Sequence, residues 1–236
     1  MNIVVLLSGG SGTRMCGSLP KQHIMADNHQ IIEYTLTAFS MSKYVDAIIV
    51  VSNPAYISYV HELKGTFEKL KWVIEGGDTR IQSVENAVGF LSDFCLPKDK
   101  IIFSDAVRPC VTLKEIENLV NSLDTYVAAT TGVEVYETVL TLCNDTISTI
   151  IPREGVVRQT SPEGYLFGTL EQLYTHEKAN TISQYRNIGI DQLYAQGVPV
   201  GVVKSNPLNF KITLPEDIYL FEAVLKQGFE KIICGR

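Results

Sequence analysis

The sequence predicts an α/β fold, a doubly wound and mostly parallel twisted sheet in a single domain of residues 1–236. Short apolar runs alternate with stretches of helical periodicity, which is the rhythm of βαβ units. The β-branched runs are apolar throughout, as expected of strands buried on both faces. Hydrophobic residues make up 45% of the chain and charged residues 19%, which is typical of a globular protein and excludes a wholly disordered one.

The first half of the chain supplies most of the predicted strands. Ile3 to Leu7 is a short apolar run that leads into glycines, and Ala47 to Val51 is a second run of apolar residues. Between them, apolar residues recur three and four positions apart, as on one face of a helix. Thr112 with Glu115 three residues later predicts the start of a further helix. The predicted strands are 3–7, 47–51, 72–74 and 101–103, and the predicted helices are 31–39, 56–70, 81–91 and one that begins after 112.

The alternation stops between Tyr126 and Arg158, a stretch rich in Val and Thr. Asn144-Asp145 is a polar turn between two β-prone runs, so this stretch predicts a β-hairpin. A projecting hairpin at about residues 134–158 is a candidate dimerisation arm, although a plain hairpin at the sheet edge explains the pattern equally well. The chain then continues with predicted helices at 170–178 and 190–196, a strand at 199–203 and a last helix that opens at 214–217.

Charge and composition restrict the partners. The formal net charge is −6, so no overall positive field attracts nucleic acid or an anionic membrane. The apolar start of the chain lacks the positive charge and the length of a signal peptide, and no run approaches the ~20 apolar residues of a membrane span. The five cysteines show no C-x-x-C spacing, which favours reduced thiols. We therefore expect a cytoplasmic protein that binds neither nucleic acid nor membrane.

A glycine-rich loop follows the first predicted strand. Residues 7–15 read Leu-Ser-Gly-Gly-Ser-Gly-Thr-Arg-Met, and Pro20-Lys21-Gln22 comes soon after. Glycines let backbone N–H groups approach a phosphate, and nearby cations neutralise its charge. The loop is not a dinucleotide fingerprint, which needs glycine at Met15, nor a P-loop, since Ser18-Leu19 replaces Lys and Ser/Thr. It predicts another kind of phosphate site, or else a tight turn with exposed cations.

Three later loops also carry charged residues among small ones. Gly76-Gly77 precedes a helix, Asp105 ends a strand, and Lys211 precedes the last helix. In an open α/β sheet, ligands bind at the C-terminal ends of the strands. There Asp105 is suited to a divalent metal or a ribose hydroxyl, although an Asp also caps turns. Lys211 by itself would be a solvated surface lysine, and the four histidines share no metal-ligand spacing.

Taken together and in order, these four loops resemble one family, the cytidylyltransferases that make CDP-linked polyols from 2-C-methyl-D-erythritol 4-phosphate or ribitol 5-phosphate. The resemblance runs from Ile3 to about Leu225. It implies a Rossmann-like, GT-A-like nucleotidyltransferase fold and a need for Mg²⁺ or another divalent cation. The matching segments are 8–14 with 20–22, 76–84 (Gly-Gly-x-x-Arg-x-x-Ser-Val), 105–109 (Asp-Ala-x-Arg-Pro) and 209–217 (Asn-x-Lys-Ile-Thr-x-Pro-Glu-Asp).

The resemblance also implies a role for each matching residue. The hairpin arm would cross to a second subunit of a homodimer, and Asp105 would lie near the ribose and hold the metal. The implied catalytic residues, around the α-phosphate of CTP, are Arg14, Lys21 and Lys211. The implied CTP-binding residues are Ser8, Gly9, Gly10, Ser11, Gly12 and Thr13 at the triphosphate, Gly77, Arg80 and Ser83 at the cytosine, and Asp105. The implied acceptor-binding residues are Arg108, Thr138, Arg153 and Ser161.

The implied reaction transfers CMP from CTP to a polyol phosphate and releases pyrophosphate. The sequence departs from the family pattern mainly on the acceptor side: Ser104 replaces His, 161–163 reads Ser-Pro-Glu in place of Thr-Pro-Gln, and Ile188-Gly189 replaces paired carboxylates. We therefore expect an alditol phosphate for surface polysaccharide as acceptor, with 2-C-methyl-D-erythritol 4-phosphate, an isoprenoid precursor, as the second candidate. The alternatives are a CTP-binding regulatory module without turnover and a nicotinamide dehydrogenase, which Met15 disfavours.

Overall fold

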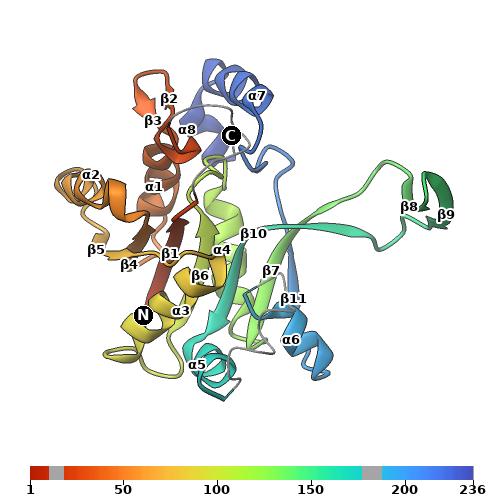
Figure 1. The fold of residues 1–236 in the computed structure, drawn as a ribbon, viewed down its shortest axis with the longest axis horizontal. Helices are drawn as coiled ribbons and strands as arrows, with labels where there is room; N and C mark the ends of the chain where they lie inside the picture. Colours follow the sequence, from red (N-terminus) through yellow and green to blue (C-terminus); the bar gives the residue numbers. More distant parts are fainter. Residues whose placement is uncertain (11–18, 177–187, 236) are drawn as a thin grey trace.

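The computed structural model describes residues 1–10, 19–176 and 188–235, and its centre is a seven-stranded sheet (Figure 1). The strand order is β11-β7-β10-β6-β1-β4-β5, and neighbouring strands are parallel except where β10 pairs with β6 and β7. The predicted doubly wound, mostly parallel α/β sheet is confirmed. The strands of this sheet are β1 (Asn2–Ser8), β4 (Ala47–Ser52), β5 (Leu70–Glu75), β6 (Lys100–Asp105), β7 (Ala128–Glu134), β10 (Val157–Leu166) and β11 (Gly201–Lys204). Two separate hairpins are β2 (Met25–Ala26) with β3 (His29–Gln30), and β8 (Val139–Cys143) with β9 (Thr146–Ile151).

Helices cover both faces of the sheet. They are α1 (Ile31–Met41), α2 (Ile57–Glu62), α3 (Arg80–Ser92), α4 (Leu113–Ser122), α5 (Phe167–His176), α6 (Ile190–Ala195), α7 (Pro215–Lys226) and α8 (Phe229–Ile233). Because successive strand residues point to opposite faces, Val4 and Leu6 pack in one core with α1, α2 and α4. Ile3 and Val5 pack in the other with α3, α5 and α6. Within the described ranges, no helix is long and apolar enough to cross a membrane.

A third, smaller core lies where the β2–β3 hairpin packs with α1, α7 and α8. Tyr34 contacts Phe221 and Phe229 edge-on, with ring centroids 5.1 and 5.0 Å apart. Ile212 is fully buried in this core, and its backbone N–H donates a hydrogen bond to the carbonyl of Val107 at 3.0 Å. The loop before α7 is therefore anchored directly beside Lys211, at the end of the sheet where β6 finishes.

The sequence pattern does not predict β7 or β10, and it misjudges one helix. β10 contains Pro162, which disfavours a strand because proline has no N–H for the ladder. The register of β10 against β7 shifts between Gln159 and Glu163, which accommodates the proline.

The predicted helix at 56–70 is wrong in extent, because the structure has only the short α2 between two 3₁₀ turns before β5 begins. Residues 177–178, at the end of another predicted helix, lie outside the described residues.

The predicted hairpin is confirmed as β8 and β9, which project from the rest of the molecule (Figure 1). We call residues 134–158 the arm. Asn144 and Asp145 form its turn with φ angles of 46° and 63°, the conformation of a two-residue hairpin turn. A two-stranded hairpin has little stability of its own, and apolar side chains exposed on it are suited to contact with another chain. The exposed apolar residues on β8 and β9 are Leu140, Leu142, Ile147 and Ile150.

Candidate active site

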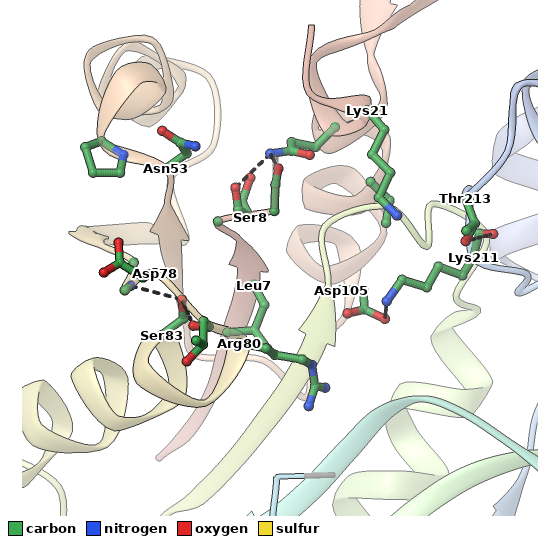
Figure 2. A pocket seen from close by; sticks show the side chains of 18 residues that line it. Leu7, Ser8, Lys21, Asn53, Asp78, Arg80, Ser83, Asp105, Lys211 and Thr213 are labelled. Carbon is green, nitrogen blue, oxygen red and sulfur yellow. Dashed lines mark hydrogen bonds and ion pairs between the residues drawn. The ribbon is translucent and has the colours of Figure 1, made fainter. Parts of the chain in front are cut away.

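A cavity of about 590 Å³ opens at the C-terminal edge of the sheet, where β1, β5 and β6 end (Figure 2). Parallel strands place their C-terminal ends at one edge, so loops that are far apart in sequence meet there. Asn53 and Pro54, which follow β4, also line the cavity, although the sequence offered no signal for them. The predicted site residues that line it are Ser8, Gly9, Gly10, Lys21, Gly77, Arg80, Ser83, Asp105 and Lys211. The four loops recognised in the sequence therefore form one site.

Lys21 reaches the cavity from a 3₁₀ turn, Lys21–His23, which follows the glycine-rich loop. Gln22 is buried, and its side-chain amide donates hydrogen bonds to the carbonyls of Ser8 at 2.8 Å and Gly10 at 3.2 Å. These bonds fix the backbone from which Lys21 extends. Gln22 was not among the predicted site residues, although it belongs to the matching Pro-Lys-Gln segment. The predicted residues Ser11, Gly12, Thr13 and Arg14 lie outside the described residues.

Ser83 organises the backbone on the α3 side of the cavity. Its hydroxyl accepts a hydrogen bond from the N–H of Gly77 at 3.1 Å and donates one to the carbonyl of Thr79 at 3.0 Å. A Cβ at Gly77 would lie only 2.3 Å from the Cβ of Gln82, and a Cβ at Gly76 would lie 3.0 Å from the Ser83 hydroxyl. Only glycine fits at Gly77, and at Gly76 the Ser83 hydroxyl would have to move, so backbone rather than side chains faces the ligand space here.

Asp105 lies at the end of β6 among cationic side chains. Its Oδ2 is 3.0 Å from Lys211 Nζ and 3.4 Å from Arg108 Nε. Burial by itself would raise the pKa of this carboxyl, but the positive charges of Lys211, Arg80 and Arg108 outweigh burial and lower the pKa. Asp105 is therefore ionised at neutral pH, and it holds Lys211 at the cavity wall (Figure 2).

Two predicted acceptor-binding residues, Arg108 and Ser161, are buried beside Asp105 and do not line the cavity. Arg108 Nη1 donates a hydrogen bond to the carbonyl of Asn209 at 2.8 Å, which joins the end of β6 to the loop that carries Lys211. The Ser161 hydroxyl accepts a hydrogen bond from the N–H of Asp105 at 3.3 Å. Both residues therefore hold the backbone that carries Asp105 and Lys211 in place. Their direct contact with the acceptor stays a prediction.

A buried carboxylate, Glu115, anchors the same loop and was not predicted as part of the site. Its Oε1 accepts hydrogen bonds from Asn206 N at 3.0 Å and Asn209 Nδ2 at 3.2 Å. Its Oε2 accepts one from Thr112 N at 2.8 Å, which is the predicted cap of α4. Asn209 Nδ2 also donates to the carbonyl of Ser161 at 2.8 Å. The sequence showed only the local capping position of Glu115, because its other partners are distant along the chain.

Arg80 begins α3 near Ser83, but its guanidinium points away from that serine and toward β10 (Figure 2). There Nη2 lies 3.6 Å from Oε1 of Glu163, which is 4% exposed. The Tyr165 hydroxyl donates a hydrogen bond to Oε2 of Glu163 at 3.0 Å. Burial raises the pKa of Glu163, and the charge of Arg80 with the Tyr165 hydrogen bond offsets only part of that rise. The Arg80 guanidinium therefore lies on the β10 side of the cavity and away from Ser83.

Thr138 and Arg153, the other predicted acceptor-binding residues, belong to the arm and do not line the cavity of their own chain. Arg153 Nη1 donates a hydrogen bond to the carbonyl of Tyr136 at 2.8 Å, which links the two sides of the arm near its base. The arm extends outward from the sheet that carries the cavity (Figure 1). These two residues can act in a cavity of this kind only if the arm reaches a second subunit.

The donor set fits a magnesium ion that is shared with a nucleotide. Among the residues that the structure describes, no group of three or more His, Cys, Asp or Glu side chains could hold a metal. Asp105 supplies one ionised carboxylate at the cavity. Mg²⁺ is commonly bound by one or two carboxylates, with substrate phosphates and water as the other ligands. One protein ligand is sufficient for that mode of binding.

An open α/β sheet whose strand ends bring together the backbone of residues 8–10, two lysines and one carboxylate is typical of the class of enzymes that bind phosphorylated substrates. The family model for 2-C-methyl-D-erythritol 4-phosphate cytidylyltransferase (IspD) matches residues 2–227. The chain belongs to this family. It is a CTP-dependent nucleotidyltransferase, as its motifs predicted.

Individual relatives agree with this assignment. The chain is 30% identical over 227 residues to the 2-C-methyl-D-erythritol 4-phosphate cytidylyltransferase of Thermotoga neapolitana, covering 96% of this chain and 98% of that protein. It is also 30% identical over 239 residues to the ribitol-5-phosphate cytidylyltransferase of Lacticaseibacillus paracasei, covering 96% and 99%. The solved 4-diphosphocytidyl-2C-methyl-D-erythritol synthase of Anaerococcus prevotii superposes with a TM-score of 0.77 at 21% identity, over 95% of this chain and 96% of that one. The Francisella tularensis cytidylyltransferase gives 0.76 at 24% identity, over 94% and 99%. The structural likeness confirms the fold.

Proposed function

We propose that this enzyme transfers CMP from CTP to a polyol phosphate and releases pyrophosphate with a CDP-polyol. The observation that best supports the proposal is that Lys21 and Lys211, from opposite ends of the chain, line one cavity with the backbone of residues 8–10. Backbone N–H groups at the glycines and the ammonium groups of the two lysines are suited to bind a triphosphate and a second phosphate group. Relatives named for 2-C-methyl-D-erythritol 4-phosphate and for ribitol 5-phosphate each match 96% of the chain.

The reaction depends on charge stabilisation more than on acid–base catalysis. The acceptor phosphate is largely ionised at neutral pH, so its oxygen attacks the α-phosphorus of CTP without a strong general base. A P–O bond forms to the acceptor as the bond to the leaving pyrophosphate breaks. Lys21 and Lys211, with Arg14, would hold the two anions together and stabilise the charge of the transition state. No nucleophilic side chain is required.

The nucleotide would lie along the wall from β1 to α3. The backbone of residues 8–10 would bind the triphosphate, and Gly77 with Ser83 would bind the cytosine. Asp105 would contact the ribose and hold Mg²⁺, which when bound neutralises phosphate charge. The acceptor would then lie beyond the α-phosphate, on the side of Asp105 and Lys211 that faces away from the nucleotide.

Of the two acceptors, we favour ribitol 5-phosphate or a similar alditol phosphate. The family's paired carboxylates are replaced by Ile188 and Gly189, and Ile188 is 2% exposed in the core under α5. Tyr174 donates a hydrogen bond to the carbonyl of Ile188 at 2.7 Å, and a Cβ at Gly189 would lie 2.7 Å from Leu173 Cδ1. Ile188 and Gly189 therefore belong to the hydrophobic core and supply no carboxylate. An acceptor that must hydrogen-bond to carboxylates at these two positions is disfavoured.

Pyrophosphate release with CTP and Mg²⁺ tests the proposal. We expect turnover with ribitol 5-phosphate, a kcat/KM at least about tenfold lower with 2-C-methyl-D-erythritol 4-phosphate, and no turnover when ATP replaces CTP. The panel should include other alditol and sugar phosphates. Tight CTP binding without pyrophosphate release from any acceptor would instead favour the regulatory module.

We also propose that the arm makes a homodimer and delivers Thr138 and Arg153 to the partner's acceptor site. The exposed apolar surface of β8 and β9 supports this proposal. Leu142 and Ile147 are paired across the hairpin and are 65% and 58% exposed.

Changing both Leu142 and Ile147 to Asp should convert the dimer to a monomer, because two charges would have to be buried in the interface. Light scattering after size exclusion, over a range of protein concentrations, measures the change. We further expect the KM for the acceptor to rise by about tenfold or more, since Arg153 would no longer reach the partner. Leu96→Asp, at an apolar residue that is 68% exposed outside the arm, is the control and should stay dimeric. A monomeric unaltered protein, or a double variant that remains a dimer, contradicts the proposal.

A further inference from the structure

The buried pair of Glu163 and Arg80 indicates a role that the proposed function does not yet include. We propose that Glu163 is a positioning residue: it holds Arg80 at the acceptor end of the cavity, where Arg80 binds the polyol phosphate instead of the cytosine. This inference rests on the proposed function and names a further specificity-determining contact for the same reaction.

The first step is the rigidity of Glu163. It lies in β10, paired with Phe103 of β6 on one side and Thr130 of β7 on the other, so both neighbouring strands hold its backbone. The carboxylate is 4% exposed and accepts the hydrogen bond from Tyr165, which is itself fully buried. A buried carboxylate is costly unless a cation compensates its charge, and Arg80 is the cation that the structure places beside it.

The second step is the placement of the Arg80 guanidinium. Its side chain is 42% exposed and lines the cavity, while Nη2 faces Glu163. Glu163 pairs with Phe103, two residues before Asp105 on β6, so the guanidinium beside Glu163 lies on the β6 side of the cavity. Ser83, on the cytosine side, instead contacts the backbone of Gly77 and Thr79. Figure 2 shows the guanidinium extending away from Ser83 and toward β10.

The third step is the length of the contact. At 3.6 Å, the Arg80–Glu163 separation exceeds the 2.7–2.9 Å typical of a charge-assisted hydrogen bond. The contact is an ion pair made by one nitrogen, Nη2, and it leaves other N–H groups of the guanidinium for a ligand. A guanidinium has five N–H groups in a rigid fork, a geometry that matches phosphate and hydroxyl oxygens. Because the Arg80 side chain lines the cavity, its remaining N–H groups suit an acceptor anion there.

Steady-state kinetics of the Glu163→Gln variant tests the inference. The concentrations of CTP and ribitol 5-phosphate are varied separately. If 2-C-methyl-D-erythritol 4-phosphate is the better acceptor, it replaces ribitol 5-phosphate. Glutamine keeps the shape of the side chain and removes its charge. We expect the acceptor KM to rise about tenfold, which is the usual loss of affinity when a residue that orients a ligand-binding side chain is changed. The kcat and the KM for CTP should change less than about threefold. Arg80→Lys should give the same pattern, and the double variant should be no worse than either single variant.

Two further variants keep the test decisive. Tyr165→Phe removes the hydrogen bond to Glu163 but leaves the charge of Glu163 in place, so it should raise the acceptor KM by a smaller factor than Glu163→Gln does. It replaces Glu163→Gln as the test if that variant fails to fold. Asp124→Asn removes an exposed carboxylate that pairs with Lys100 and should change neither KM. An unchanged acceptor KM, or a rise confined to CTP, overturns the inference while the unaltered enzyme remains active. No pyrophosphate release from the unaltered enzyme with any acceptor overturns the proposed function and, with it, this inference.

Discussion

Changing Lys21 to Ala should lower the kcat of pyrophosphate release by about 10²-fold or more, with a smaller effect on the KM for CTP. Lys21 lines the cavity from a turn that Gln22 ties to the glycine-rich loop. A charge held in that position needs no reorganisation when negative charge builds up on the phosphates. Its contribution should therefore appear in the transition state more than in substrate binding. Initial rates at saturating CTP and acceptor measure the effect.

Lys98→Ala is the matched control for this prediction. Lys98 is exposed and lies outside the cavity, so its loss should leave kcat within about twofold. Thermal unfolding of both variants distinguishes lost catalysis from lost folding. A normal kcat for Lys21→Ala would remove this lysine from the catalytic group.

Changing Asp105 to Asn should lower kcat/KM by on the order of 10²-fold and raise the Mg²⁺ concentration needed for half-maximal rate. The carboxylate is the one proposed protein ligand for the metal, and its pKa is lowered by three neighbouring cations. Asparagine retains the size of the side chain but removes the charge that pairs with Lys211 at 3.0 Å. Lys211 would therefore also lose its anchor. A magnesium titration of the initial rate measures both effects.

Asp93→Asn serves as the control, because Asp93 is an exposed residue at the end of α3 and distant from the cavity lining. It should leave the magnesium titration unchanged. If Asp105→Asn keeps the magnesium dependence of the unaltered enzyme and loses rate only, then Asp105 anchors Lys211 but does not hold the metal.

The loops of the site were predictable because each has a local signature. Gly77 is required by close packing against Gln82, and Asp105 is the last residue of a buried strand. Such features depend on residues that are near in sequence. The same holds for the cap at Thr112 and the turn at Asn144-Asp145, both of which the structure confirms.

The supports of the site were not predictable in this way. Glu163 lies on a strand that contains a proline and shifts register, so its pattern did not indicate a strand at all. Glu115 appeared only as a helix-capping residue, whereas its bonds to Asn206 and Asn209 join residues that are 91 and 94 positions apart in the sequence. Arg80 matched a family motif, but the motif does not show which way the side chain points.

The sequence by itself determined the class of fold, the order of the loops and the family, because apolar periodicity and glycine spacing express short-range sterics and burial. Only the tertiary structure decided how the charges are paired: Lys211 and Arg108 with Asp105, and Arg80 with Glu163. The physical reason is that an ion pair depends on the distance between two charges in space, which is independent of their separation along the chain. Each of these contacts depends on how strands from distant parts of the chain are ordered in the sheet, and above all on β10, which brings Glu163 to the side of β6.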